Sequence, residues 1–485
     1  MACVILWFRR DFRLADNPAL QAAVDSGYPV LPVYIHDPEA EGDWAPGAAS
    51  NWWRHHSLQA LSDALAERGL GLVIRRGPAG DTLANLINET GAEAVHWNRL
   101  YEPALIARDS AIKARLRDGG IAAHSHNAAL LYEPWTIRTG SGTDYRAFSP
   151  FWRACQRAAQ PPEPAPEPPL AAGTSAESLT IADLGLLPRV RWDGGLAARW
   201  RPGEAGALQR LDAFLGHGVA SYETMRDRPA VDGTSGLSPH LHFGELGPRQ
   251  VRAATLAAIA DADDHAQDSA NAFLAEIGWR EFAHHVLYHH PDFPDQPLNA
   301  RFADFPWREE PDQLLQAWRR GETGFPIVDA GMRQLWETGW MHNRVRMIVG
   351  SLLVKNARIP WQTGERWFWD TLVDADLASN SLGWQWVAGS GADAAPFFRI
   401  FNPVRQGERF DPEGAFVAHW VPEIASLPAK HRHAPWQAPA GVCRDAGLRM
   451  GHDYPWPVLD LQATRKEALA AFEQIKDPPG DDSRQ

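Results

Sequence analysis

Residues 4–36, VILWFRRDFRLADNPALQAAVDSGYPVLPVYIH, place two apolar, β-branched runs on either side of a helical one. The runs VILWF and PVLPVYIH are typical of buried strands. Between them, Asp16 or Asn17 can cap a helix that has Pro18 in its first turn. Two strands joined by a helix form a βαβ unit, so this stretch predicts neighbouring parallel strands.

The same alternation continues to about residue 130. Further strands are expected at 70–76, 92–97 and 121–126, and further helices at 52–69, 80–91 and 103–120. Gly69, Gly91 and Gly119 stand where a helix commonly ends in a left-handed residue. We therefore predict an α/β N-terminal domain with a doubly wound parallel sheet, residues 1–130. No G-x-G-x-x-G follows the first strand, so the sheet alone does not predict a dinucleotide.

A proline-rich run, PPEPAPEPP at 161–169, favours a stiff and extended connector. We place an interdomain connector at 131–205. From about residue 206 the patterns are helical, as in NAFLAEIGWREFAHHVLYHH and HNRVRMIVGSLLVKNAR. This predicts a larger all-α C-terminal domain at 206–475.

Bulk composition limits the function. The formal charge of -13 argues against binding nucleic acid over the whole surface, so such a role needs a local basic patch. Cys3, Cys155 and Cys443 form no C-x-x-C pattern, which predicts no metal centre and a reducing, cytoplasmic location. The apolar run MIVGSLLV is too short to span a bilayer, so no membrane association is expected. With 22 tryptophans against 8 tyrosines, a planar ligand becomes worth considering.

Residues 374–386, DADLASNSLGWQW, gather acids, an amide and indoles. Asp376, Asn380 and Trp384 follow i, i+4, i+8 spacing and would share one side of a helix. A plain reading is a helix start with acids facing the dipole, followed by a core tryptophan. A Mg²⁺ site at Asp374 and Asp376 ranks lower, because no phosphate-binding P-loop accompanies it.

A local basic patch is offered by residues 339–364, which contain Arg344, Arg346, Lys355 and Arg358 and no acid up to Gly364. Arg344 and Arg346 lie two apart, so on a helix one can meet DNA while the other turns toward an acid such as Asp374. A solvated helix face would show the same pattern.

Two further motifs are weaker by themselves. Residues 222–246 carry a glycine and hydroxyl turn before a helix start at Ser238, which suits a pyrophosphate but also an ordinary cap. Glu276 and Arg280 are four apart on a helical pattern and could form a simple ion pair. The paired histidines, such as His284 with His285, show no metal-binding spacing, so a structural role is preferred.

Taken together, six motifs resemble the DNA photolyase/cryptochrome family, most closely a bacterial cyclobutane pyrimidine dimer photolyase. They are WFRRDFRLADNPAL, DGTSGLSPHLHFGEL, WREF, TGFPIVDAGMRQLWETGWMHNRVRM, DADLASNSLGWQW and FRIFNPVRQGERFDPEG. The resemblance runs over nearly the whole chain. It implies an N-terminal antenna domain and a helical domain that holds FAD and binds DNA.

By motif, the resemblance assigns residues to three roles. The FAD-binding set is Tyr222, Thr234, Ser235, Gly236, Leu237, Ser238, Arg280, Trp340, Arg346, Asp374, Asp376 and Asn380. The catalytic set is Glu276 and Asn343 for hydrogen bonds to the pyrimidines, Asn380 facing flavin N5, and the electron path Trp384, Trp361 and Trp307. The DNA-binding set is Arg226, Glu276, Trp279, Arg280, Asn343, Arg344, Trp386, Arg399 and Gln406.

Single residues bear on the type of family member. The resemblance implies light-driven repair, because Asn380 stands where plant cryptochromes carry aspartate, and His342 with Asn343 replaces the His-His of (6-4) photolyases. Phe273 stands where several members have tryptophan. A second, antenna chromophore is implied, with methenyltetrahydrofolate preferred and a deazaflavin as the alternative. The expected partner is DNA with pyrimidine dimers, bound by a monomer.

Two other functions stay open at this point. A cryptochrome-type blue-light photoreceptor without repair activity would share the motifs but not need Asn380, Glu276 or Trp386. A flavin-dependent oxidoreductase that works in the dark would consume NAD(P)H, which we do not expect.

Overall fold

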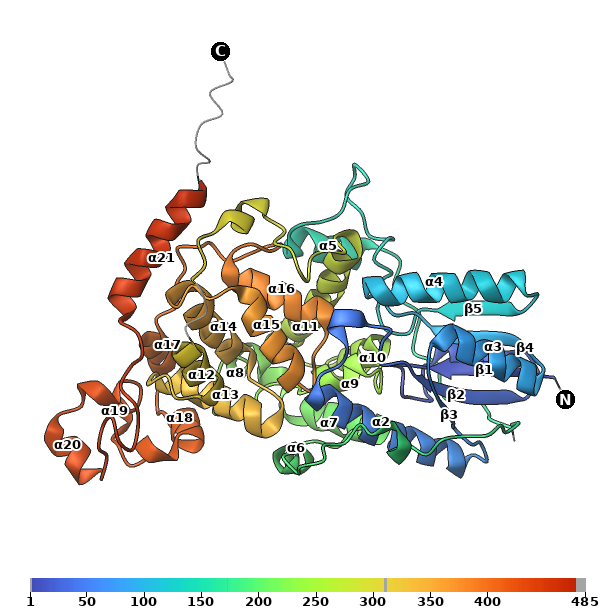
Figure 1. The fold of residues 1–485 in the computed structure, drawn as a ribbon, viewed down its shortest axis with the longest axis horizontal. Coiled ribbons are helices and arrows are strands. Elements are labelled where there is room, and N and C mark those ends of the chain that lie inside the picture. The colour runs from blue at the N-terminus through green and yellow to red at the C-terminus, as the bar shows by residue number, and fades with distance from the viewer. Residues whose placement is uncertain (1, 172, 309–311, 477–485) are drawn as a thin grey trace, which may run out of the picture. The chain divides into compact units, whose positions relative to one another are not determined.

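The computed structural model describes residues 2–171, 173–308 and 312–476. These residues form two compact units, each described by itself below (Figure 1). Unit 1 consists of Met1–Glu223, Ser235–Pro291 and Val373–Ala378, and unit 2 of Thr224–Thr234, Asp292–Leu372 and Ser379–Gln485. The sequence boundaries at residues 130 and 205 stay a prediction.

Unit 1 begins with a five-stranded sheet in which every neighbouring pair is parallel. The strands are β1 (Cys3–Phe8), β2 (Val30–His36), β3 (Val73–Arg76), β4 (Ala92–Asn98) and β5 (Ala122–His126). Their order is β3-β2-β1-β4-β5, so the chain reverses its direction across the sheet after β3. This arrangement confirms the predicted doubly wound sheet.

Four helices connect these strands: α1 (Pro18–Asp25), α2 (Ala48–Glu67), α3 (Ala79–Thr90) and α4 (Pro103–Asp118). Figure 1 labels α2, α3 and α4 beside the sheet. β1 is buried along its whole length, which explains its continuous apolar sequence. Trp7, Val33, Leu83 and Val95 belong to one core that the strands and helices build together.

The helix ends follow the predicted signals with one exception. Asn17 caps α1, because its side chain accepts the amide of Leu20 at 3.1 Å. Gly69 and Gly91 are left-handed, with φ of 76° and 66°. The prediction for Gly119 is wrong: its φ is -80°, and Gly120 is the residue in the left-handed conformation, with φ of 79°. Because α4 continues to Asp118, the reversal falls one residue later than the sequence pattern suggested.

The rest of unit 1 is helical. Its longer helices are α5 (Phe148–Arg157), α6 (Gly194–Arg199), α7 (Glu204–His217), α10 (Pro248–Ala258) and α11 (Asp264–His289), and it also contains the short α9 (Ser238–His242). The short α8 (Tyr222–Met225) begins in unit 1 and ends in unit 2. The proline-rich run has neither helix nor strand, and the backbone N–H of Asp16, in the loop after β1, donates a hydrogen bond to the carbonyl of Ala165 in this run at 2.8 Å.

Two buried carboxylates of unit 1 accept hydrogen bonds from residues that are distant in the sequence. Glu245 accepts Trp53 Nε1 at 2.9 Å, Ser57 Oγ at 2.5 Å and the amide of Gly203 at 2.7 Å. Glu281 accepts the amides at 131 and 132 at 2.9 and 3.0 Å. Burial nevertheless raises the pKa of Glu281 to about 7. These bonds fix α2, the start of α7 and α11 within unit 1.

Unit 2 contains helices in its described part and no strand longer than an isolated bridge. Its helices are α12 (Asp312–Arg320), α13 (Pro326–Thr338), α14 (Asn343–Ser351), α15 (Trp361–Thr371), α17 (Pro403–Phe410), α18 (Ala415–Trp420), α19 (Ala429–Arg432), α20 (Ala440–Asp445) and α21 (Leu461–Lys476). The helix α16 (Leu377–Ala388) begins with the last residues of the 373–378 segment and continues into unit 2.

A π-helical turn interrupts the helix expected at 342–358. It follows α14 directly and spans Leu352–Asn356, and the amide of Ala357 donates to the carbonyl of Leu352 at 2.9 Å. Arg358 then has a positive φ of 56° and ends the helix before Pro360. Single turns of this kind are rare and frequently occur at functional sites.

Candidate functional site

In unit 1, the predicted phosphate turn is a real backbone reversal. Gly236 is left-handed with φ of 63°, and a Cβ there would lie 2.9 Å from Nε of Arg210. That guanidinium donates to the carbonyl of Ser235 at 2.6 Å. Ser238 begins α9 and its hydroxyl donates to Asp374 at 2.6 Å. The structure therefore brings Ser235, Gly236, Ser238 and Asp374 together.

The neighbouring residues of this motif are packed by an aromatic cluster. Leu237 is buried, and the half-buried Thr234 comes just before the turn. Tyr222 is buried against Phe273 at 5.4 Å between ring centroids. Phe273, the departure from the family pattern, is thus an ordinary core residue here.

Asp376 is a buried acid that two histidines of unit 1 hold. Oδ2 lies 3.5 Å from Nδ1 of His242 and 3.6 Å from Nε2 of His284. Burial opposes the charge of Asp376, but the two rings hold its pKa well below the usual value. Burial also lowers the pKa of both histidines, so the three groups compete for charge. We assign the negative charge to Asp376, because Arg280 adds a positive charge on its side.

A second buried ion pair stands beside this cluster. Arg10, from the loop after β1, binds Glu102 at the start of α4. Burial opposes the charge of Arg10, but Glu102, Glu41 and Asp376 together raise its pKa. The acid beside the predicted flavin site is therefore part of a charge network that reaches the α/β sheet of unit 1. Sequence reasoning missed His242, His284, Arg10 and Glu102.

Helix α11 carries three predicted residues at i, i+3 and i+4. Glu276, Trp279 and Arg280 are all half-buried. The indole of Trp279 stacks on Phe148, with 4.0 Å between centroids and 9° between planes. Arg280 donates to the carbonyl of Ala129 at 2.6 Å, so part of its guanidinium holds the chain after β5. The stacked Trp279 is a rigid apolar surface for a planar group.

In unit 2, Asn380 is oriented by a single bond. It lies in the first turn of α16, is 9% exposed, and its Nδ2 donates to the carbonyl of Glu365 at 3.1 Å. No donor within the described part of the chain reaches its Oδ1. Burial raises the pKa of Glu365 well above its usual value, and its carboxyl accepts a hydrogen bond from the Ser381 hydroxyl at 2.5 Å. The amide oxygen is therefore a fixed hydrogen-bond acceptor.

The helix pattern expected from Asp376 through Asn380 to Trp384 needs a correction. Because α16 begins at Leu377, Asp376 lies before the helix, and it does not continue the helical face of Asn380 and Trp384. The bonds that Asp374 and Asp376 make in unit 1 explain why these residues remain in the preceding turn.

The three predicted electron carriers all lie in unit 2. Trp384 is 4% exposed and Trp361 1%, whereas Trp307 is half-buried and packs on Phe305 at 4.4 Å. Trp384 lies against Gly364, where a Cβ would be only 2.1 Å from Cη2. Gly364 follows Trp361 by three residues on α15, so both face the same side of that helix. Ring contacts of Trp384 are with Phe368 at 5.0 Å and Trp318 at 6.3 Å.

The start of α14 presents polar groups. Asn343 is exposed. Arg344 forms a bidentate pair with Asp227 at 2.8 and 2.7 Å, and its guanidinium lies over Phe410 at 4.5 Å. Arg346, two residues on, donates to the carbonyl of Met341 at 2.7 Å. The two arginines therefore do point to different partners, as their spacing predicts.

Five further residues of the predicted site belong to unit 2. Trp340 is 8% exposed and contacts His342 at 6.2 Å between centroids, and Arg226 is half-buried. Trp386 on α16 and Gln406 on α17 are half-buried, while Arg399 between these helices is exposed.

The basic patch at 339–364 is smaller than the sequence suggests. Lys355 is 1% exposed and cannot belong to a surface patch. Arg358 lies 3.6 Å from Glu467 of α21, so its charge is paired. Lys355 belongs to the π-turn, and the partner of Arg358 comes from a distant helix, so no local pattern of charges reveals either difference.

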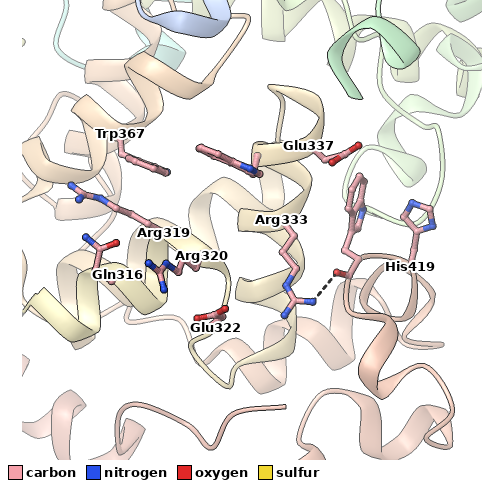
Figure 2. Close-up of a pocket in the computed structure, with 10 residues that line it drawn as sticks. Gln316, Arg319, Arg320, Glu322, Arg333, Glu337, Trp367 and His419 are labelled. Atoms are coloured by element: carbon pink, nitrogen blue, oxygen red, sulfur yellow. Dashed lines mark hydrogen bonds between the residues drawn. The ribbon is translucent and has the colours of Figure 1, made fainter. Parts of the chain in front are cut away.

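Figure 2 shows a pocket of about 880 Å³ in unit 2 that contains none of the predicted residues. Arg333 crosses it from α13 and pairs with Glu423 at 2.9 Å. Trp336 and Trp367 are parallel within 6° at 6.0 Å, and Arg319 lies over Trp367 at 5.0 Å. The complete lining is Gln316, Arg319, Arg320, Glu322, Arg333, Trp336, Glu337, Trp367, His419 and Trp420.

The described residues show neither a metal-binding cluster nor a membrane-spanning helix. Within 2–171, 173–308 and 312–476, histidine, cysteine, aspartate and glutamate form no group that could hold a metal ion. None of the helices in those ranges has the length and apolarity needed to cross a bilayer. The three cysteines are free thiols.

Comparison with known proteins identifies the family. Residues 4–169 match the family described as DNA photolyase, and residues 273–474 match the FAD binding domain of DNA photolyase. The chain is 47% identical to a deoxyribodipyrimidine photo-lyase of Agrobacterium fabrum, over 98% of each sequence. It is 39% identical to cryptochrome-1 of Arabidopsis thaliana, over 98% of this chain and 70% of that protein.

A solved structure agrees with these relatives. The crystal structure of a bacterial class III photolyase from Agrobacterium tumefaciens matches with a TM-score of 0.94 at 47% identity, covering 98% of both chains. Fold, motifs and relatives lead to one conclusion, which the sequence resemblance had predicted. This chain, a parallel α/β domain followed by a helical FAD-binding domain, belongs to the DNA photolyase family.

Proposed function

We propose that this protein is a deoxyribodipyrimidine photo-lyase that repairs cyclobutane pyrimidine dimers in DNA under blue light. The observation that carries the proposal is the orientation of Asn380. Its amide nitrogen is bound to the carbonyl of Glu365, and its oxygen is left as an acceptor in an otherwise buried position. Such an oxygen fits the N5–H that only a reduced flavin carries.

The residues present fit FAD. Reduced FAD, when bound and excited by light, would supply the electron that splits the dimer and would receive it back. Tyr222 and the turn from Thr234 to Ser238 would hold the phosphates and the ribityl chain, together with Arg280. Asp374 and Asp376 would place negative charge near the ring, and we propose that Trp340 and Arg346 bind the same cofactor.

The lesion requires groups that bind two pyrimidines outside the duplex. Photolyases act on an extruded base. Glu276 and Asn343 would hydrogen-bond the pyrimidine edges, and Trp279 and Trp386 would form apolar walls. Trp279 is suited to this because its stacking on Phe148 fixes the ring plane before DNA arrives.

The surrounding DNA would be held by four polar side chains, Arg226, Arg344, Arg399 and Gln406. The arginines would neutralise phosphates, which makes the affinity dependent on salt. The bidentate pair between Arg344 and Asp227 orients this guanidinium but also reduces its free charge. We therefore expect the exposed Arg399 to contribute more to the salt dependence than Arg344.

Trp384, Trp361 and Trp307 would carry an electron from the protein surface to oxidised flavin. The close packing of Trp384 on Gly364, one helical turn after Trp361, supports the first step. An antenna chromophore, methenyltetrahydrofolate or alternatively a deazaflavin, would extend light absorption. We place the protein in the cytoplasm as a monomer, and note that its free cysteines suit a reducing compartment.

The decisive experiment illuminates the reduced holoprotein with DNA that contains thymine dimers and follows the loss of dimers. Repair in the light and none in the dark is expected. Absence of any light-dependent loss would refute the enzyme and favour a cryptochrome-type photoreceptor, the alternative that the 39% identity to cryptochrome-1 keeps in view. Consumption of NAD(P)H in darkness would instead indicate an oxidoreductase.

Two substitutions test the site with spectroscopy. Asn380→Asp should change which flavin redox state persists under light, and an unchanged photoreduction spectrum would refute the placement of Asn380 at N5. Trp384→Phe should block photoreduction of oxidised flavin while the chemically reduced enzyme still repairs DNA. If photoreduction proceeds normally in Trp384→Phe, electrons do not pass through this indole.

A further inference from the structure

Lys355 is a buried amine with no acidic partner. It is 1% exposed and lies in the π-helical turn Leu352–Asn356. Its Nζ donates to the carbonyl of Arg399 at 3.3 Å and lies 5.2 Å from the centre of the Phe397 ring. No carboxylate of the described chain comes within 4.0 Å of it. Burying a cation without a counter-charge costs folding free energy. A methionine of similar volume would fill the same space without this cost, so packing alone does not explain the lysine.

The acceptor of this bond belongs to a loop between two helices of unit 2. Residues 389–402 connect α16, which carries Trp386, to α17, which carries Gln406. Within the loop, Phe397 is buried and stacks on Phe472 at 4.4 Å, whereas Phe398 is 68% exposed and Arg399 is exposed as well. The loop thus presents an aromatic ring and a guanidinium to the surface.

A second buried side chain holds the same loop two residues later. The hydroxyl of Ser351, which is 1% exposed, accepts the amide of Phe401 at 3.1 Å. Ser351 precedes Lys355 by four residues, and both face the loop. The guanidinium of Arg399 lies 6.0 Å from the ring of Phe401, so its direction depends on the backbone that these two residues hold.

We propose that Ser351 and Lys355 act as positioning residues that clamp the backbone of Arg399 and Phe401, so that Arg399 and Phe398 are presented to damaged DNA. This inference rests on the proposed function, because it takes the exposed loop as part of the DNA-binding surface. The amine needs no charge partner in this role, because a carbonyl and an aromatic face are both acceptors for an N–H group. The π-turn widens the helix where Lys355 leaves it toward the loop.

The clamp predicts a separation of binding from chemistry. Lys355→Met keeps an unbranched chain of similar volume and removes the donor, and Ser351→Ala removes the acceptor. Each should weaken the affinity for DNA with a single thymine dimer about tenfold in the dark, as expected for the loss of about 1.4 kcal/mol. The rate of light-driven repair at saturating DNA should stay within about twofold, because neither side chain touches the lesion. Lys466→Met, an exposed lysine on α21, is the matched control and should change neither quantity.

Hydrogen exchange at the amides of Ile400 and Phe401 in the holoprotein gives a readout that does not depend on DNA. Both variants should exchange faster there than the wild type, and Lys466→Met should not. Unchanged exchange would overturn the clamp whatever the protein does to DNA. Faster exchange with affinity within twofold of wild type would overturn the link to DNA binding. If the wild type neither binds nor repairs dimers, the proposed function fails, and exchange alone decides whether the clamp exists.

Discussion

Replacing Lys355 by methionine should make the folded protein more stable at neutral pH while it weakens the loop. Burial, followed by the charge of Arg399, lowers the pKa of Lys355 from 10.5 to about 7. Each pKa unit corresponds to about 1.4 kcal/mol, so the buried amine lowers the free energy of unfolding by about 4 kcal/mol at pH 7. Removing the bond to the Arg399 carbonyl offsets about 1 kcal/mol of this gain.

The size of this destabilisation depends on pH. Above a pH of about 10.5, the amine is neutral in both the folded and the unfolded protein, so it carries no penalty. As the pH falls from there to about 7, Lys355 becomes protonated in the unfolded chain but stays largely neutral in the folded chain, so the wild type loses stability. The advantage of Lys355→Met should therefore be largest at and below about pH 7 and should shrink steadily toward pH 10.

The assay is urea unfolding of the holoprotein, followed by circular dichroism at several pH values between 7 and 10. We expect Lys355→Met to unfold at higher urea concentration than the wild type at pH 7, by about 2–4 kcal/mol after relaxation of the site. Lys466→Met, with its exposed amine, should match the wild type throughout. A variant that is less stable than the wild type at pH 7, or a difference that does not depend on pH, would refute the reasoning.

Three other predictions follow from single contacts. Gly364→Ala places a methyl group 2.1 Å from Trp384 and should cost about 1–3 kcal/mol and slow photoreduction of FAD; normal photoreduction kinetics would refute this packing. Glu281→Gln should remove the loss of stability that the wild type shows as the pH rises from about 4.5 to about 7, measured by urea midpoints at pH 5 and 8. Asn17→Ala should lower the free energy of unfolding by about 1–2 kcal/mol through loss of the α1 cap, and an unchanged melting temperature would argue against that cap.

The α/β half could be predicted because its signals are local. Each strand is a short apolar run, each helix has its own cap or end, and the order of elements along the chain then dictates a parallel sheet. Even the error at Gly119 is only one residue, since it depends on where α4 stops. The turn at Gly236 and the start of α9 at Ser238 could be predicted for the same reason.

The buried polar groups could not be predicted in this way. Asp376 meets His242 and His284 from segments that are more than 90 residues away in the chain, and no spacing rule connects them. Lys355 looked like part of a basic surface because it follows two arginines, but the π-turn directs it inward. The pairing of His284 with His285 was visible in the sequence, yet nothing there indicated which acid a histidine would bind.

The segment Val373–Ala378 belongs to unit 1, although unit 2 supplies the chain on both sides of it. It brings Asp374 to Ser238 and Asp376 to the two histidines. During synthesis, therefore, the buried polar contacts of unit 1 cannot all form until residues up to 378 have been translated. A nascent chain that has reached only residue 291 would hold His242 and His284 without their acid, and it should be a better substrate for chaperones and proteases than its well-ordered sheet suggests.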